Sequence, residues 1–253
     1  MQESLAIGNT WLAVAAVALF VLTPAAHSQH PDLTGVWTTY RGAGGPGGFG
    51  GPRQQPSLTP EAQAKADLYR SVITGTNYSP GAYCVGGGMP SSMLGSGGYP
   101  MEIIQRPEQI TVIYEAHNEI RRIYFGDRAP APESVFPERN GRSVGRWEGD
   151  TLVVETDRLV EQVDTTYPHS AEARIVESYR LSTEDGGKKV LTATLTMTDP
   201  VFLTEPFTVE KKWEAVPNGR LMTYECTEPD WLDLLDRLMR EAAADAPAAA
   251  ATN

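Results

Sequence analysis

Residues 101–125 read MEIIQRPEQITVIYEAHNEIRRIYF and contain three short apolar runs with turn residues between them. In the middle run, Ile110, Val112 and Tyr114 occupy alternate positions and therefore share one face of a strand. Turn residues separate the runs at Pro107-Glu108 and His117-Asn118. This stretch predicts consecutive antiparallel strands.

The same alternation continues along most of the chain. With a short strand around Trp37, about ten strands are expected, enough for a barrel or a curved sandwich that hides its own edges. The predicted fold class is therefore mainly β, an antiparallel meander closing on itself. The remaining expected strands are SVGRW (143–147), TLVVET (151–156), ARIVESYRL (173–181), KVLTATLTM (189–197), FTVEKKWEA (207–215) and RLMTYEC (220–226).

Two helices are expected beside the strands. Thr59-Pro60-Glu61 provides an N-cap, a proline at the first helical position and an acidic first turn for a short helix that ends near Arg70. A second, amphipathic helix follows the capping pattern Thr227-x-x-Asp230. We expect its apolar stripe to pack across an open end of the sheet, with a partner-binding helix as the alternative. The stripe consists of Trp231, Leu234, Leu235, Leu238 and Met239.

The first residues decide the compartment. Trp11 to Leu22 is an unbroken apolar run of twelve residues, too short to cross about 30 Å of hydrocarbon as a helix. Ala26-x-Ser28 fits a cleavage site before Gln29, which predicts a signal peptide over residues 1–28 and a periplasmic or secreted protein. An uncleaved N-terminal anchor is the alternative, because the segment before the apolar run lacks Lys and Arg.

The charge of the chain restricts its partners. The formal net charge is −11, and removing residues 1–28 takes away only Glu3, which leaves −10. Nucleic acid and anionic lipid both require a concentrated Lys/Arg surface, so we expect neither as a partner. After cleavage, no integral membrane segment is expected.

Two cysteines remain in the mature chain, Cys84 and Cys226. In an oxidising compartment they predict one disulfide, with a reactive or metal-binding thiol as the alternative. We expect one domain in which residues 29–98 supply a strand, the glycine-rich loop 42–53 and a short helix, and residues 99–228 supply the barrel core. Residues 229–253 form the C-terminal helix and an alanine-rich tail.

One polar set suggests a site. On the strand 173–181, Glu177 lies among apolar neighbours, so its carboxylate must be paired or shift its pKa upward. Arg122 is the expected partner, because its face also carries Ile120 and Tyr124. The alternatives are a buried ion pair that fixes strand register and a solvated sheet edge. The candidate catalytic residues are Glu177, His169 and Tyr124, and the candidate ligand-binding residues are Arg122, Tyr179, Glu102 and Tyr114.

The sequence contains no motif for a metal site, a catalytic nucleophile or a phosphate-binding loop. His30, His117 and His169 are isolated, and no metal-binding, nucleophile-elbow or phosphate-loop spacing occurs. We expect no metal and no cofactor.

Several motifs of the chain resemble those of a known group of proteins. PDLTGVW (31–37), YPMEIIQ (99–105), IRRIYFGDR (120–128), SVGRWEGDTLVVET (143–156) and PHSAEARIVESYRL (168–181) resemble a group of uncharacterised secreted bacterial proteins. The resemblance implies a lipocalin-like or calycin-like β-barrel and no particular activity. The chain departs from the group at Ser91, where an Arg is frequent, and at Arg142, where a His is frequent.

These observations lead to three hypotheses about function. The first is an exported barrel that binds a small, mainly apolar molecule in its interior. The second is a cofactor-independent isomerase, cyclase or hydrolase of the same architecture. The third is an envelope interaction protein that uses the C-terminal helix or the glycine-rich loop.

Overall fold

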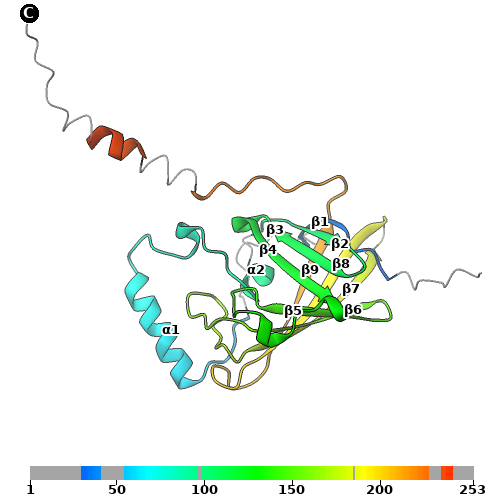
Figure 1. Ribbon diagram of the computed structural model, residues 1–253, viewed down its shortest axis with the longest axis horizontal. Coiled ribbons are helices and arrows are strands. Elements are labelled where there is room, and N and C mark those ends of the chain that lie inside the picture. The colour runs from blue at the N-terminus through cyan, green and yellow to red at the C-terminus, as the bar shows by residue number, and fades with distance from the viewer. Residues whose placement is uncertain (1–29, 41–53, 96–97, 185, 228–234, 242–253) are drawn as a thin grey trace, which may run out of the picture.

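The computed structural model describes residues 30–40, 54–95, 98–184, 186–227 and 235–241 (Figure 1). It confirms a mainly β fold, in which nine strands form a closed barrel in chain order. The predicted signal peptide and glycine-rich loop 42–53 lie outside the described residues. The strands are β1 (Gly35–Thr39), β2 (Met101–Gln105), β3 (Gln109–Tyr114), β4 (Glu119–Phe125), β5 (Arg142–Glu148), β6 (Thr151–Asp157), β7 (Arg174–Glu184), β8 (Lys188–Thr198) and β9 (Phe207–Ala215).

Short helices accompany the barrel. Besides the C-terminal helix over residues 235–241, these are α1 (Pro60–Ile73) and α2 (Ser91–Leu94), with 3-10 turns η1 (Gly81–Tyr83), η2 (Ala116–Asn118), η3 (Gly126–Arg128) and η4 (Pro132–Ser134). The position of α1 confirms the helix predicted after Thr59. Within the described residues, no helix combines the length and apolar character that crossing a membrane would need.

Strand β1 closes the barrel. It pairs with β2 through Trp37↔Met101 and with β9 through Trp37↔Ala215, so both of its edges are occupied. The prediction that residues 220–226 form a further strand is wrong, since they have no regular secondary structure. Closure by β1 explains this difference, because the barrel offers no free edge for another strand.

One pairing departs from the expected meander. Strands β4 and β5 are parallel, with Ile123↔Ser143 and Phe125↔Gly145 in register, whereas the other eight pairings of the described barrel are antiparallel. Parallel neighbours need a crossover rather than a hairpin. Residues 126–141, which carry η3 and η4, make that crossover.

The barrel interior is filled by side chains. Ile175, Leu191 and Leu195 have no exposed surface, and Trp37 and Trp213 are also buried there. These residues come from the neighbouring strands β7, β8, β9 and β1, and the same core contains Ile103, Ile110 and Ile123 of β2, β3 and β4, so side chains from all round the barrel form one apolar core.

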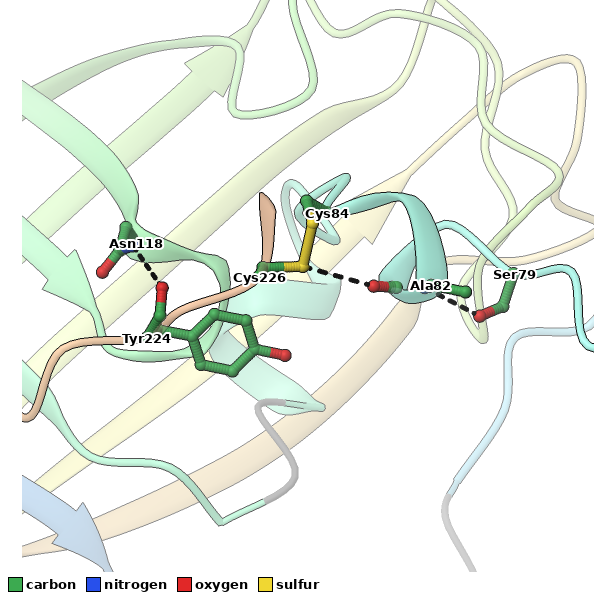
Figure 2. The surroundings of a disulfide bond; sticks show 7 residues. Ser79, Ala82, Cys84, Asn118, Tyr224 and Cys226 are labelled. Carbon is green, nitrogen blue, oxygen red and sulfur yellow. Dashed lines mark hydrogen bonds between the residues drawn. A yellow bond between two sulfur atoms is a disulfide. The ribbon is translucent and has the colours of Figure 1, made fainter. Parts of the chain in front are cut away.

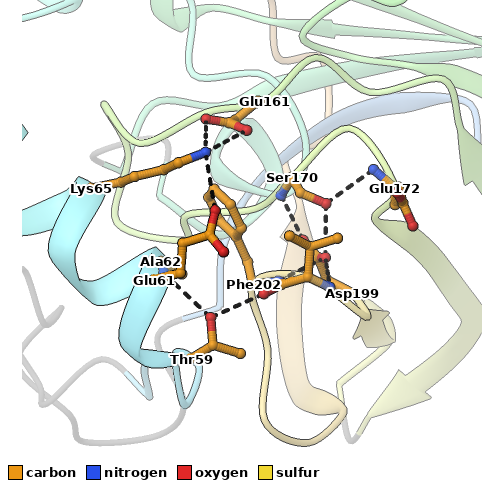
Figure 3. Close-up of polar contacts among 10 residues, drawn as sticks. Thr59, Glu61, Ala62, Lys65, Glu161, Ser170, Glu172, Asp199 and Phe202 are labelled. Atoms are coloured by element: carbon orange, nitrogen blue, oxygen red, sulfur yellow. Dashed lines mark hydrogen bonds and ion pairs between the residues drawn. The ribbon is translucent and has the colours of Figure 1, made fainter.

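Helix α1 is fixed to one end of the barrel, as Figure 3 shows. The Thr59 hydroxyl donates to the Val201 carbonyl at 2.9 Å and accepts from the Ala62 N–H at 3.3 Å, which caps the helix. Lys65 forms an ion pair with Glu161 at 2.9 Å. The helix therefore lies beside the residues that connect β6 to β7.

The C-terminal helix is described over residues 235–241. Leu235, Leu238 and Met239 are exposed by 38%, 47% and 64%, respectively. The predicted packing of the apolar stripe across the barrel end is therefore wrong for these three residues, which lie away from the barrel (Figure 1). Trp231 and Leu234, the other members of the stripe, lie outside the described residues.

Candidate functional site

Glu177 is paired inside the barrel, but with Arg121. The carboxylate accepts hydrogen bonds from Arg121 Nη1 at 3.0 Å, from Arg121 Nη2 at 2.5 Å and from the Tyr179 hydroxyl at 2.8 Å. Arg121 also donates to Ser143 and Thr156, at 3.0 and 2.8 Å. The side chains of Glu177 and Arg121 are 0% and 1% exposed. The pair is thus sealed and well satisfied with hydrogen bonds.

The prediction that Arg122 pairs with Glu177 is wrong. The β3–β4 register places Arg121 opposite Val112, so Arg121 points into the barrel and Arg122 points outward and is exposed. Tyr124 follows Arg122 on the outer face, and Glu102 alternates with buried residues of β2 in the same way. These three candidates therefore do not meet Glu177.

Burial dominates the electrostatics of this cluster. It raises the pKa of the Tyr179 and Tyr114 hydroxyls, so both stay neutral. Burial alone would lower the pKa of Arg121, but the adjacent Glu177 carboxylate outweighs it, and the pKa of Arg121 is raised. Arg121 therefore remains a cation, and the arrangement fits a buried ion pair that fixes strand register.

His169 occupies a different place from Glu177. It is fully buried, its Nδ1 lies 3.2 Å from the Ser170 carbonyl oxygen, and its backbone pairs with that of Gln162. Its Nε2 has no hydrogen-bond partner among the described residues. Burial lowers the pKa of His169, which favours the neutral imidazole.

A cavity of about 610 Å³ lies at the barrel end where β3 turns into β4. We call it the mouth cavity. Its wall is formed by α1, the segment 80–95, the β3–β4 turn and the residues that connect β6 to β7. Of the site residues predicted from the sequence, Tyr114 lines it. Its principal polar and aromatic residues are Tyr69, Arg70, Ser91, Ser92, Tyr99, Tyr114, His117, Glu119, Arg139, Asp164, Thr165 and Tyr167.

Glu119 is the carboxylate that the β3–β4 turn brings to this cavity. Its Oε1 accepts hydrogen bonds from the Gly88 N–H and from Asn140 Nδ2, both at 2.9 Å. Its Oε2 accepts one from the Ser92 hydroxyl at 2.5 Å. Glu119 therefore has a fixed orientation in the cavity wall.

Arg139 and Asp164 form a second polar group in the cavity. Arg139 Nη2 lies 2.5 Å from Asp164 Oδ2, and Arg139 Nε donates to the Gly86 carbonyl at 3.1 Å. These residues and Glu119 were missed from the sequence, because they come from distant segments and no local motif joins them.

An aromatic cluster lines one part of the cavity through Tyr99 and His117. Its third member, Tyr224, lies close to the disulfide (Figure 2). Tyr224 stacks on His117 with ring centroids 5.0 Å apart and meets Tyr99 edge-on at 5.5 Å. Asn118 Nδ2 donates to the Tyr224 carbonyl at 2.8 Å. The predicted disulfide is confirmed, with the Cα atoms of Cys84 and Cys226 5.6 Å apart. It ties the segment that carries Tyr224 to the cavity wall.

Among the described residues, no three His, Cys, Asp or Glu side chains come together as candidate metal ligands. No family model, curated protein or solved structure compared with the chain matches it. The geometry of the mouth cavity is therefore the basis for the function proposed below.

Proposed function

We propose that this protein binds a small molecule in the mouth cavity. The main support for the proposal is a cavity of about 610 Å³ whose wall combines aromatic rings with the oriented polar groups of Glu119, Arg139 and Asp164. Ligand pockets have volumes of about 300–1,000 Å³ and place a few fixed polar groups in a largely apolar lining.

The position of the cavity changes the ligand expected from the sequence. A mainly apolar ligand was expected inside the barrel, yet the side chains around Glu177 pack there in a continuous core. Glu119 and Asp164 instead favour a ligand that has both polar and apolar parts, because covering them with a purely apolar surface would remove water without replacing its hydrogen bonds.

We also propose that the protein acts in the periplasm or outside the cell. The signal-peptide pattern of residues 1–28 supports this location. The disulfide fits it, since such bonds persist in oxidising compartments. If the leader is cleaved as expected, N-terminal sequencing of the mature protein will begin at Gln29, whereas a chain that begins before residue 11 would indicate a retained anchor.

Native mass spectrometry of protein purified from its own cell envelope tests the binding proposal. Val163 lines the cavity, so Val163→Trp should place an indole ring in the binding space and abolish the additional mass of a retained molecule. Val176, which is 45% exposed on the outer face of β7, provides the matched control. Val176→Trp should retain the molecule. Wild-type protein without a retained molecule, or equal retention in both variants, would contradict the proposal.

A further inference from the structure

Each charged side chain of the mouth cavity already has a polar partner. Among the described lining residues, Arg70 and Arg139 carry positive charge, and Glu119 and Asp164 carry negative charge. Arg139 pairs with Asp164, Arg70 pairs with Asp67, and Glu119 accepts three hydrogen bonds. An anionic ligand would lose its hydration without gaining a free cation, because both arginines are already paired. The Glu119 carboxylate has no cationic partner in the described part of the chain, but it already accepts three hydrogen bonds from neutral donors. This arrangement favours a neutral ligand over an anionic one.

Aromatic rings give the cavity flat apolar surfaces. Tyr99 and His117 line one part of the cavity, and the ring of Tyr224 contacts both of their rings. Tyr69 of α1 and Tyr167 contribute further rings to the wall. An aromatic ring combines an apolar face with a polar edge in Tyr and His. The cavity therefore suits a flat molecule whose faces carry C–H groups and whose edges carry polar groups.

The polar lining consists of donors and acceptors that already contact one another. Ser92 donates to Glu119, and Arg139 donates to Asp164. A third contact joins the hydroxyls of Ser91 and Thr165. A ligand hydroxyl donates and accepts at once, so it can join such a pair and leave neither member unsatisfied. A ligand with several hydroxyls would use several of these pairs together.

From these three features we infer that the mouth cavity binds a neutral saccharide. This inference rests on the proposed function and specifies its ligand class. A sugar ring presents C–H faces to aromatic rings and hydroxyls at its edge, and it carries no charge. The cavity volume falls within the usual range for small-molecule pockets.

Saturation-transfer NMR with purified full-length protein tests the ligand class. The neutral probes are N-acetylglucosamine, maltose and cellobiose, and the comparison probes are glucuronate, glucosamine and laurate. We expect transfer to the ring C–H protons of at least one neutral sugar and none to the comparison probes. Binding of laurate, or of the charged sugars alone, would overturn the inference.

Two tyrosine substitutions locate the binding. Tyr99→Ala should weaken the Kd of the bound sugar, measured by calorimetry, at least tenfold, because it removes a ring from the cavity wall. Tyr83 is 64% exposed and is not among the lining residues, so Tyr83→Ala should leave the Kd unchanged. Equal affinities in the two variants would overturn the assignment of the sugar to this cavity.

The two proposals can fail separately. If Val163→Trp abolishes retention of a native molecule that is not a saccharide, the saccharide inference is wrong and the proposed function stands. If Val163→Trp leaves retention unchanged, both are wrong.

Discussion

Glu177→Gln is expected to destabilise the fold strongly. The substitution removes the counter-charge of Arg121, which is 1% exposed, and replaces a carboxylate that accepts three hydrogen bonds. Breaking a buried ion pair from one side lowers the free energy of unfolding by about 3–5 kcal/mol, out of a typical total of about 5–15 kcal/mol. With an m-value of about 2 kcal/mol/M, the urea midpoint should fall by about 2 M.

Urea unfolding followed by tryptophan fluorescence measures this change. The double variant Arg121→Met with Glu177→Leu removes both charges and keeps apolar volume in the core, so it should recover most of the stability lost by Glu177→Gln. The reasoning would be refuted if Glu177→Gln shifted the free energy of unfolding by less than about 0.5 kcal/mol, a change usual for surface substitutions.

Three further changes probe other parts of the structure. Because burial lowers the pKa of His169 in the folded state, the unfolded chain takes up a proton first on acidification. The stability that the neutral, buried His169 contributes is fully present above about pH 6.5 and is lost as the pH falls below that value. His169→Gln should therefore reduce the dependence of the free energy of unfolding on pH, measured by urea unfolding at several pH values. Replacing Cys84 and Cys226 together by serine should lower the free energy of unfolding by at most about 5 kcal/mol on the chain-entropy model. Thiol titration of the unfolded, unreduced wild type should find no free thiol. Two titratable thiols would disprove the disulfide. Thr59→Ala should reduce the free energy of unfolding in urea by about 1–2 kcal/mol, because it removes the N-cap of α1 and the hydrogen bond to Val201. An unchanged urea midpoint would show that the cap is dispensable.

The sequence predicts the barrel well because strand alternation is a local signal. It fails on β4, whose sequence EIRRIYF has apolar residues on both faces and two adjacent arginines. Alternation alone does not show whether Arg121 or Arg122 points into the barrel, since a shift of one residue exchanges the two faces of the strand. Pairing of Val112 with Arg121 settles the question, and pairing depends on tertiary structure.

The prediction for the site is weaker than the prediction for the fold. Glu177 is buried among apolar residues as expected, because its neighbours on β7 alternate clearly. Glu119, Arg139 and Asp164 lie far apart in the sequence, and only the closed barrel and its connecting segments bring them to one cavity. The parallel β4–β5 pairing is also invisible in the sequence, because it depends on the path of residues 126–141.

Ligand binding in the mouth cavity can be seen directly in a crystal structure of the protein purified from its own cell envelope. We expect electron density for a small molecule in the mouth cavity, between the ring of Tyr99 and the Arg139–Asp164 pair, with the barrel interior occupied by side chains alone. Density for a ligand beside Glu177 inside the barrel, or bound on the outer face, would contradict this expectation.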